Sequence, residues 1–505
     1  HYSTCSIDGT EEGEEEEQDD MDMLRMSQIN LTAVPDDLVD KAETDCVVWL
    51  GNMATKSPDA VESGEVSATM NMMKKYSPNV SIQQYACQAI YGLLHAAASS
   101  TSTTTTTTTQ DDPIRQQILI SLLVQTDAVE LLLNAMQQHM DLLPILHPCI
   151  SALVKLSHYS MAVQAMSQRK EQLYATLMEA MKCHLSDPTF ISLACQWIHQ
   201  LLSKDKSIKA RILSSSSSQQ DVNEIVSLVV SISKEHLQSS DVVPQATAVL
   251  YQFSRSHKGV GNVPGICPTV IQVMNVHLAI AQVQSNGAGI LKNLCVNESA
   301  IQTIASEGGI AVLLAAMTAH PASDTLQYHA CGALKHLSFA EANEIAIAKQ
   351  GGIAAVLEAM KRHGQDVNLQ QEAFAALRNL FVSEKNKRAI AKKHEDIIVM
   401  MERMQEHLAN AQLQQKACTY YFEKPTSLIL NVCSYIYQSG FSLTSFFIWF
   451  LPAPFFLLVC VKFCPTNNTG YRRRTTESLG PFRISKTNHQ SWRHRCHYLR
   501  HGPSR

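Results

Sequence analysis

The chain has 505 residues and a formal net charge of −5, with 45% hydrophobic residues but only 6% aromatic residues. Ala, Leu, Ile and Met supply most of the apolar side chains. This favours helices and argues against a β-sheet domain, because unbranched side chains lose little rotamer freedom on a helix. The 14 cysteines form no CxxC pair, so we expect reduced thiols, many of them in cores, rather than a disulfide framework.

The amino-terminal segment, residues 1–38, is strongly acidic. Through Asp37 it carries twelve Asp and Glu residues against Arg25 alone. Such a segment buries too little apolar surface to order its backbone, so we expect a disordered, solubilising tail. The chain begins at His1 rather than with Met, and we expect it to be a fragment.

An internal repeat of about 43 residues follows this tail. A shift of 43 residues places Gly308-Gly309-Ile310 on Gly351-Gly352-Ile353. Each unit has a Met position, with a small residue 13 positions later and large apolar residues 17 and 20 positions later. The Met position is occupied by Met73, Met136, Met181, Ser233, Met274, Met317, Met360 and Met404. The sequence therefore predicts a repeat array over residues 39–420, with seven readable units, a truncated eighth and a partial unit in front.

Each unit is predicted to fold as three helices. Positions 13, 17 and 20 have the i, i+4, i+7 spacing of one stripe along a helix, the third of the unit. The segment from Ile353 to His363 is the second helix, and Gly351-Gly352 separates it from a short first helix around Asn343 to Gln350. One unit alone leaves an apolar face exposed, so the units must stack to be stable.

Two low-complexity runs interrupt the even spacing. Thr103–Thr109 and Ser214–Ser218 cannot pack in a core. We assign them to loop insertions at 97–113 and 205–220. Successive Met positions are 63 residues apart across the first run and 52 across the second, against 41 to 45 elsewhere. The insertions therefore lengthen loops after third helices and leave the helices unchanged.

The repeat stops in the middle of a third helix after Ala417-Cys418, and residues 421–505 differ in composition. Residues 441–463 are largely apolar and long enough to cross a bilayer, although Pro452 and Pro454 would interrupt the helix. The remainder is basic. We interpret residues 421–505 as lying outside the fold, as translated non-coding or frame-shifted sequence. The alternative is a membrane anchor that tethers the array.

The repeat resembles that of the armadillo family. The resemblance rests on Gly-Gly-Ile at the second helix and on a Gln-x-x-Ala motif in the third, at Gln83–Ile90, Gln327–Leu334 and Gln370–Leu377. It covers roughly residues 39–420. It implies an all-α fold, a right-handed α-solenoid (superhelix) of about seven to eight armadillo repeats, whose third helices line a concave groove for extended peptides. HEAT repeats are the alternative, but they lack the Gly-Gly break.

The resemblance also points to residues of the groove. In armadillo proteins that bind peptides, an Asn just before the last Leu of the third-helix motif often bonds the ligand backbone. The matching residues here are Asn293, His336 and Asn379. Importin-alpha-like members also carry a Trp four residues earlier, where this chain has Gly289, Gly332 and Ala375. This difference argues against a nuclear-import receptor for basic signals.

The residue before each of these three positions is basic: Lys292, Lys335 and Arg378. On a helical wheel this position lies away from the core stripe, and stacked units would place the charges roughly 10 Å apart. We predict a basic groove for an acidic, extended partner segment, which Coulomb attraction would steer toward it. The alternatives are a solvated helix face, or a groove in which the acidic tail takes the place of such a ligand.

A histidine recurs three residues after most of the Met positions. Neighbouring copies are at least a helix spacing apart, too far to share a metal ion through bonds of about 2 Å. At the end of a second helix, a His can instead donate to the last backbone carbonyls. We therefore expect a structural role and no metal site. The residues are His139, His184, His236, His277, His320, His363 and His407.

No nucleophile, acid–base pair or phosphate-binding loop occurs at usable spacing, which argues against an enzyme. We expect a soluble, cytoplasmic or nuclear scaffold that binds another protein, without a cofactor and without nucleic acid. The alternatives are a membrane-tethered adaptor, which depends on residues 441–463, and a nuclear transport adaptor. We also expect Lys335→Glu to leave folding unchanged and to weaken binding of an acidic ligand.

Overall fold

The computed structural model describes residues 36–55, 63–99, 112–125, 127–204, 218–256, 258–383, 386, 399–400, 402–404, 406–407, 410 and 412–413. These residues form helices and the turns between them, with no strand among them. The chain divides into two compact units, His1–Ala417 and Cys418–Arg505, and every described residue belongs to the first. The acidic tail up to residue 35, most of both loop insertions and residues 421–505 lie outside the described residues.

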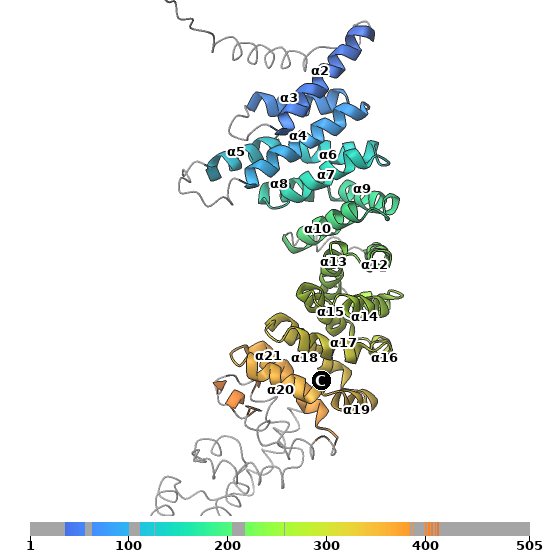
Figure 1. Ribbon diagram of the computed structural model, residues 1–505, viewed down its shortest axis with the longest axis vertical. Helices are drawn as coiled ribbons and strands as arrows, with labels where there is room; N and C mark the ends of the chain where they lie inside the picture. Colours follow the sequence, from blue (N-terminus) through green and yellow to red (C-terminus); the bar gives the residue numbers. More distant parts are fainter. Residues whose placement is uncertain are drawn as a thin grey trace, which may run out of the picture. The chain divides into compact units, whose positions relative to one another are not determined.

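In five of the seven units the described helices follow the predicted order of three, and in the other two units a second and a third helix are described (Figure 1). A lone helix, α2 (Asp36–Thr55), comes first. The next four units contain α3 (Ser63–Lys75) and α4 (Val80–Ser99); α5 (Asp112–Gln125), α6 (Ala128–Gln138) and α7 (Leu143–Leu156); α8 (Ser160–Gln168), α9 (Lys170–Cys183) and α10 (Pro188–Lys204); α12 (Ser218–Glu235) and α13 (Val242–Ser256). The last three contain the 3-10 helix η3 (Lys258–Asn262), α14 (Ile266–Val276) and α15 (Ala281–Leu294); α16 (Glu298–Ser306), α17 (Gly309–Ala319) and α18 (Asp324–Leu337); α19 (Glu341–Lys349), α20 (Gly352–Arg362) and α21 (Val367–Leu380).

The Gly-Gly pair between the first and second helices meets two separate needs. Gly351 has a φ of 87°, in the left-handed region, and a Cβ there would meet no atom within 4 Å. Its conformation alone therefore calls for glycine. Gly352 is needed for space, because a Cβ there would lie 2.3 Å from Ile347 Cγ2. The predicted break is confirmed, and the second glycine also lets α20 begin close against α19.

A buried Gln at the start of the third helix ties that helix to the end of the second. Gln370 Nε2 donates to the carbonyl of Met360 at 2.9 Å and to that of His363 at 3.0 Å. Carbonyls at a helix end have no donor within their own helix, so they need one from outside. The corresponding bonds are made by Gln83, Gln284 and Gln327. The Gln of the motif is thus a cap supplied by the next helix.

The recurring His joins each unit to the preceding one. His363 ends α20, and its Nε2 lies 2.8 Å from the carbonyl oxygen of Pro321. A carbonyl only accepts, so this nitrogen carries the proton. The other bonds run from His139 to Ser77, His184 to Met140, His236 to Leu185, His277 to Leu237, His320 to Leu278 and His407 to Gly364. The predicted structural role is confirmed. The predicted acceptor is wrong, because the ring reaches the previous unit rather than its own helix.

The core follows the predicted apolar stripe of the third helices. Leu291, Leu334 and Leu377 are 0% exposed and lie on α15, α18 and α21. Each of these helices packs against the next, and contact between consecutive third helices is more extensive than between consecutive second helices. Units stacked through a continuous layer of third helices make this part of the chain an α-solenoid.

The cysteines of the described residues are free thiols. Seven of the eight are buried, and Cys183 is exposed. Burial raises the pKa of the Cys195 and Cys331 thiols to about 12, which keeps them protonated and unreactive at neutral pH. Cys87 and Cys149 have their sulfur atoms 3.2 Å apart without a disulfide. The expectation of reduced core thiols is confirmed for these residues.

Candidate functional site

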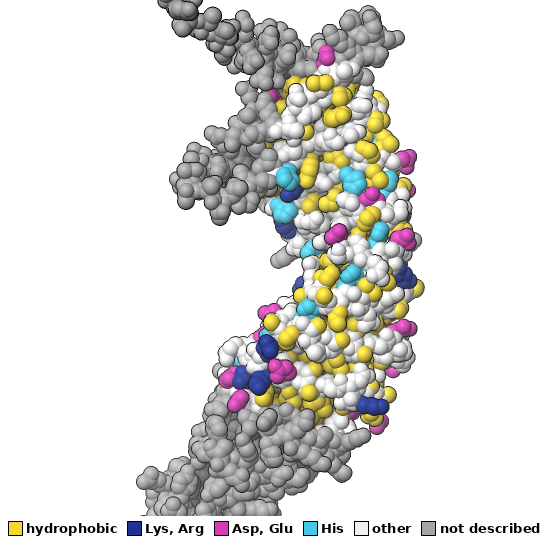
Figure 2. Space-filling view, in the orientation of Figure 1, with side chains coloured by type: hydrophobic (Ala, Val, Ile, Leu, Met, Phe, Trp, Pro, Cys, Tyr) yellow, Lys and Arg dark blue, Asp and Glu magenta, His cyan; other side chains and the backbone are white. Residues whose placement is uncertain are grey.

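The predicted basic residues lie on the third-helix layer, where neighbouring units meet. Lys292, Lys335 and Arg378 are half-buried on α15, α18 and α21, and Tyr251 of α13 holds the same repeat position one unit earlier. We call these four residues the central row. In the space-filling view, acidic side chains lie beside basic ones over the α18–α21 end of the array (Figure 2). The charge that each cation of the central row offers to a ligand therefore depends on the side chains around it.

Lys335 forms an ion pair with Glu372 of α21. Its Nζ lies 2.5 Å from Glu372 Oε2. The Lys335 side chain is 18% exposed and that of Glu372 is 15% exposed, so solvent screens the pair only weakly. The pair joins α18 to α21 and neutralises the cation. An acidic ligand at Lys335 would compete with Glu372 for the ammonium group.

Lys292 lies across the next third helix. Its Nζ is 3.8 Å from the centroid of the Tyr328 ring, which is a cation–π contact. Its aliphatic stem passes over Gly332, where a Cβ would lie 2.8 Å from Lys292 Cδ. The glycine that stands where import receptors have a Trp therefore makes room for a lysine of the same chain.

The two Asn residues of the predicted groove bond to the unit before them. Asn379 Nδ2 donates to the carbonyl of Lys335 at 2.9 Å, and Asn379 Oδ1 accepts from Arg378 Nη2 at 3.2 Å. Asn293 Nδ2 donates to Ser254 Oγ at 3.0 Å. These amides hold neighbouring third helices together, so they are already engaged before a ligand arrives. Their predicted role in bonding a peptide backbone stays a prediction.

His336 is the remaining predicted site residue. Its ring faces that of Phe339, with the centroids 6.1 Å apart. Burial lowers the pKa of His336, Lys335 lowers it further, Glu372 raises it, and Lys292 lowers it. The ring is therefore neutral at physiological pH and has one nitrogen that donates and one that accepts.

A tyrosine–histidine pair, which the sequence pattern did not predict, joins α13 to α18 across the unit that lies between them. Tyr251 Oη lies 3.0 Å from His329 Nε2. The two rings meet over Gly289 of α15, where a Cβ would lie 2.5 Å from Tyr251 Cε2. Burial lowers the pKa of His329 to about 4, and the Lys292 and Arg255 cations add to the effect. The glycine in the middle helix was the one sequence signal that could have indicated this contact.

Three exposed apolar side chains recur along one edge of the third-helix layer. Val296, Phe339 and Val382 are each 66% exposed, and each follows the end of its third helix by two residues. We call these three residues the edge row. They are separated by the repeat distance of 43 residues and lie four positions after the basic residues of the central row. The same 43-residue shift that predicted the core could have found them.

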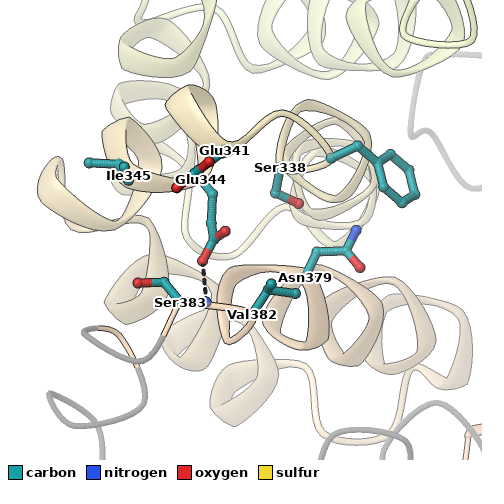
Figure 3. Close-up of a pocket in the computed structure, with 8 residues that line it drawn as sticks. Ser338, Glu341, Glu344, Ile345, Asn379, Val382 and Ser383 are labelled. Atoms are coloured by element: carbon teal, nitrogen blue, oxygen red, sulfur yellow. Dashed lines mark hydrogen bonds between the residues drawn. The ribbon is translucent and has the colours of Figure 1, made fainter. Parts of the chain in front are cut away.

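A pocket of about 490 Å³ opens between the last two side chains of the edge row (Figure 3). It is lined by Ser338, Phe339, Glu341, Glu344, Ile345, Asn379, Val382 and Ser383. Glu344 is 4% exposed, and its Oε1 accepts from Ser383 N at 2.8 Å and from Asn386 Nδ2 at 3.3 Å. The pocket thus combines apolar and neutral polar side chains with two carboxylates, and none of the lining residues that the structure describes is basic.

Potential metal ligands do not gather in the described part of the chain, where no group of three or more His, Cys, Asp or Glu side chains could hold an ion. Taken singly, none of the described helices is long and apolar enough to cross a membrane. Two bent helix pairs reach that length and composition together: Leu119–Gln125 with Ala128–Gln138, at 60°, and Glu298–Ser306 with Gly309–Ala319, at 71°. Residues 441–463 lie outside the described residues.

The stacked units and the two rows on their third helices define a helical-repeat protein, an α-solenoid. One similar solved chain comes from work on a conserved phosphorylation switch that controls the interaction between cadherin and beta-catenin. It is 14% identical, the match covers 83% of this chain and 82% of that one, and the TM-score is 0.49. Another is an engineered protein from the Northeast Structural Genomics Consortium, at 18% identity, 50% and 96% coverage and a TM-score of 0.40. No protein-family model and no curated protein matches the chain.

Proposed function

We propose that the chain is a non-enzymatic scaffold of the armadillo type, which binds an extended segment of a partner protein along its third-helix layer. The observation that carries the proposal is the edge row, three apolar side chains that are each 66% exposed and one repeat apart. Exposed apolar groups contribute nothing to the core. A partner that covers them removes them from water, which is favourable by roughly 25 cal/mol per Å².

The armadillo assignment is supported by the features on which the sequence resemblance rests. The Gly-Gly break has a conformational and a packing role at Gly351 and Gly352. The motif Gln, as at Gln370, caps the helix before it. A sequence that keeps these residues at a 43-residue spacing is one selected to stack three-helix units, and stacked units offer long surfaces for partners.

The spacing of the units suits an extended peptide. Packed helices lie roughly 10 Å apart, and an extended chain rises about 3.3 Å per residue. A segment crossing α15, α18 and α21 therefore presents about every third residue to the edge row. The central row runs beside this path. His336, with its neutral ring, is placed to exchange hydrogen bonds with the backbone of such a segment.

Panning a phage-displayed random-peptide library on the immobilised full chain tests the proposal. The enriched peptides are then measured against two triple variants of the full chain. One variant alters the edge row, with Val296→Ser, Phe339→Ser and Val382→Ser. The matched control alters three other exposed apolar residues, with Val80→Ser, Met161→Ser and Val276→Ser.

We expect the edge-row variant to bind the enriched peptides at least about ten-fold more weakly, because buried apolar anchors dominate binding energies. The control variant should bind like the wild-type chain. A library that yields no enriched peptide, or peptides that bind both triple variants equally well, would contradict the proposal.

The two alternative functions have less support. A membrane-tethered adaptor depends on residues 441–463, which lie outside the described residues. A nuclear transport adaptor for basic signals would need aromatic side chains at Gly289 and Gly332. Those positions are covered instead by Tyr251 with His329, and by the stem of Lys292.

A further inference from the structure

The pocket between the last two residues of the edge row carries negative charge that no cation among the described residues offsets. Glu341 and Glu344, both in the first turn of α19, line it. In the described part of the chain, neither carboxylate forms an ion pair. Glu344 has only neutral donors, the Ser383 N–H and Asn386 Nδ2. A largely buried carboxylate with neutral partners attracts a cation more strongly than an exposed one does, because solvent screens it less.

The walls around these carboxylates are partly apolar, with Phe339, Ile345 and Val382 beside the polar Ser338, Asn379 and Ser383. Phe339 and Val382 are each 66% exposed, and Ile345 is 52% exposed. In Figure 3, Glu341, Glu344 and Ile345 come from one helix, and Val382 and Ser383 lie opposite them. The side chain that matches such a pocket has an apolar stem and a cationic head.

Arginine matches this pocket better than lysine. Its guanidinium group has five N–H donors, so it can serve two carboxylates at once, whereas an ammonium group acts as a single point charge. It is also less strongly hydrated and stacks on aromatic rings, such as the exposed ring of Phe339.

We infer that this pocket receives an arginine side chain of the partner segment, with its guanidinium group on Glu341 and Glu344 and its stem against Phe339 and Val382. This inference rests on the proposed function, because the pocket lies between two residues of the edge row. It names the charge of the partner, which the edge row alone leaves open.

The unit before the pocket indicates which residue of the partner segment accompanies that arginine. A shift of 43 residues places Ile301 where the pocket has Glu344, and Glu298 where it has Glu341. The equivalent place between Val296 and Phe339 therefore keeps the exposed carboxylate but has an apolar side chain instead of the buried one. An apolar partner residue suits the side of that place that Ile301 forms. One repeat spans about three residues of extended chain. The partner segment should therefore carry an apolar residue and an arginine three positions apart.

This partner differs in charge from the acidic segment that the sequence predicted. The cations of the central row already have partners within the chain: Lys335 pairs with Glu372, Lys292 lies on Tyr328, and Arg378 bonds Asn379. Among the described residues, the carboxylates of the pocket have no cationic partner. Charge complementarity therefore favours a basic and apolar segment over an acidic one.

The test uses the peptides enriched by panning on the wild-type full chain. Their affinities are measured for the wild-type chain, for Glu341→Lys and for the control Glu307→Lys. Glu341 and Glu307 are both exposed and lie at the beginning and the end of first helices. Thermal melting by circular dichroism verifies that each variant is folded, and Glu341→Gln serves as a milder second variant.

We expect the enriched peptides to share an arginine three positions from an apolar residue. Glu341→Lys should weaken binding by about ten-fold or more, and Glu307→Lys by less than about two-fold. Replacing the peptide arginine by glutamate should abolish binding to the wild-type chain and restore it with Glu341→Lys.

Two other results would overturn the inference, and they differ in what they say of the proposed function. Peptides that need the edge row but bind Glu341→Lys and Glu341→Gln at wild-type strength would leave the scaffold function standing and remove the arginine pocket. A library without enriched peptides, or peptides indifferent to the edge-row variant, would remove both.

Discussion

His363 Nε2 donates a hydrogen bond of 2.8 Å to the backbone carbonyl of Pro321, in the unit before it. The same bond recurs along the array, each time from the end of one second helix to the turn that follows the previous one. Consecutive second helices make less extensive contact than third helices do. The recurring histidines therefore link consecutive second helices by hydrogen bonds, at the side of the array where the helices share less apolar contact.

His363→Ala should lower the free energy of unfolding by about 1 kcal/mol, because it removes one inter-unit hydrogen bond. Native-state hydrogen exchange should show the loss mainly in the last described units, since repeats are stabilised by their neighbours. His363→Gln is the control, because its amide can still donate and should lose less. Identical losses for the two variants would mean that the ring acts by packing rather than as a donor.

Leu334→Ala should cost about 2–5 kcal/mol of unfolding free energy, because it leaves a cavity where α18 packs against its neighbours. Leu334 is 0% exposed. Val296→Ala, at a 66% exposed position, should change the value by no more than about 0.5 kcal/mol. Urea denaturation followed by circular dichroism measures both. A loss well under 1 kcal/mol for Leu334→Ala would mean that the helix has been assigned the wrong face.

Lys335→Glu should destabilise the fold, contrary to the expectation from sequence alone. The Lys335–Glu372 pair is 18% and 15% exposed, so the variant would bring two carboxylates together with little solvent between them. We expect a loss of about 2–4 kcal/mol, since breaking a largely buried pair leaves an uncompensated charge. The charge swap Lys335→Glu with Glu372→Lys should recover most of it. A fully stable single variant would show that the pair is not formed in solution.

Acid should destabilise the array through His329. The pKa of His329 is lowered to about 4, mainly by burial, whereas an unfolded His has a pKa of about 6.5. The unfolded state therefore takes up a proton first as the pH falls. The stability contribution is full above about pH 6.5 and is lost progressively down to about pH 4. Between pH 7 and pH 5 the wild-type chain should lose roughly 2 kcal/mol more than His329→Gln. Equal pH dependence of the two proteins would contradict a buried neutral ring.

The sequence predicted the elements that repeat, because the same 43-residue period fixes the positions of the helices and of the breaks between them. The stripe through Leu291, Leu334 and Leu377 and the break at Gly351-Gly352 recur with the spacing of the helices. A helical wheel gives the direction of a side chain on its own helix. It does not give the rotation and offset between two neighbouring helices.

The contacts of the candidate site depend on this rotation and offset between neighbouring helices. Whether Lys335 meets Glu372, 37 residues later, depends on how α18 sits against α21. The same holds for Tyr251 and His329, which meet only because Gly289 lies between them. The charges of the central row were predictable, but their partners were not. The edge row was overlooked for another reason, since its residues follow the ends of the helices, outside the stripes that helical periodicity selects.

Hydrogen–deuterium exchange of the full chain, with and without an enriched peptide, tests the central claim most directly. A partner segment along the edge row should slow amide exchange at the three turns around Val296, Phe339 and Val382, each one repeat from the next. The ends of the second helices, around His320 and His363, should exchange as in the free chain. Protection confined to the second helices, or to a single turn of the edge row, would contradict the claim that these residues form one continuous binding surface.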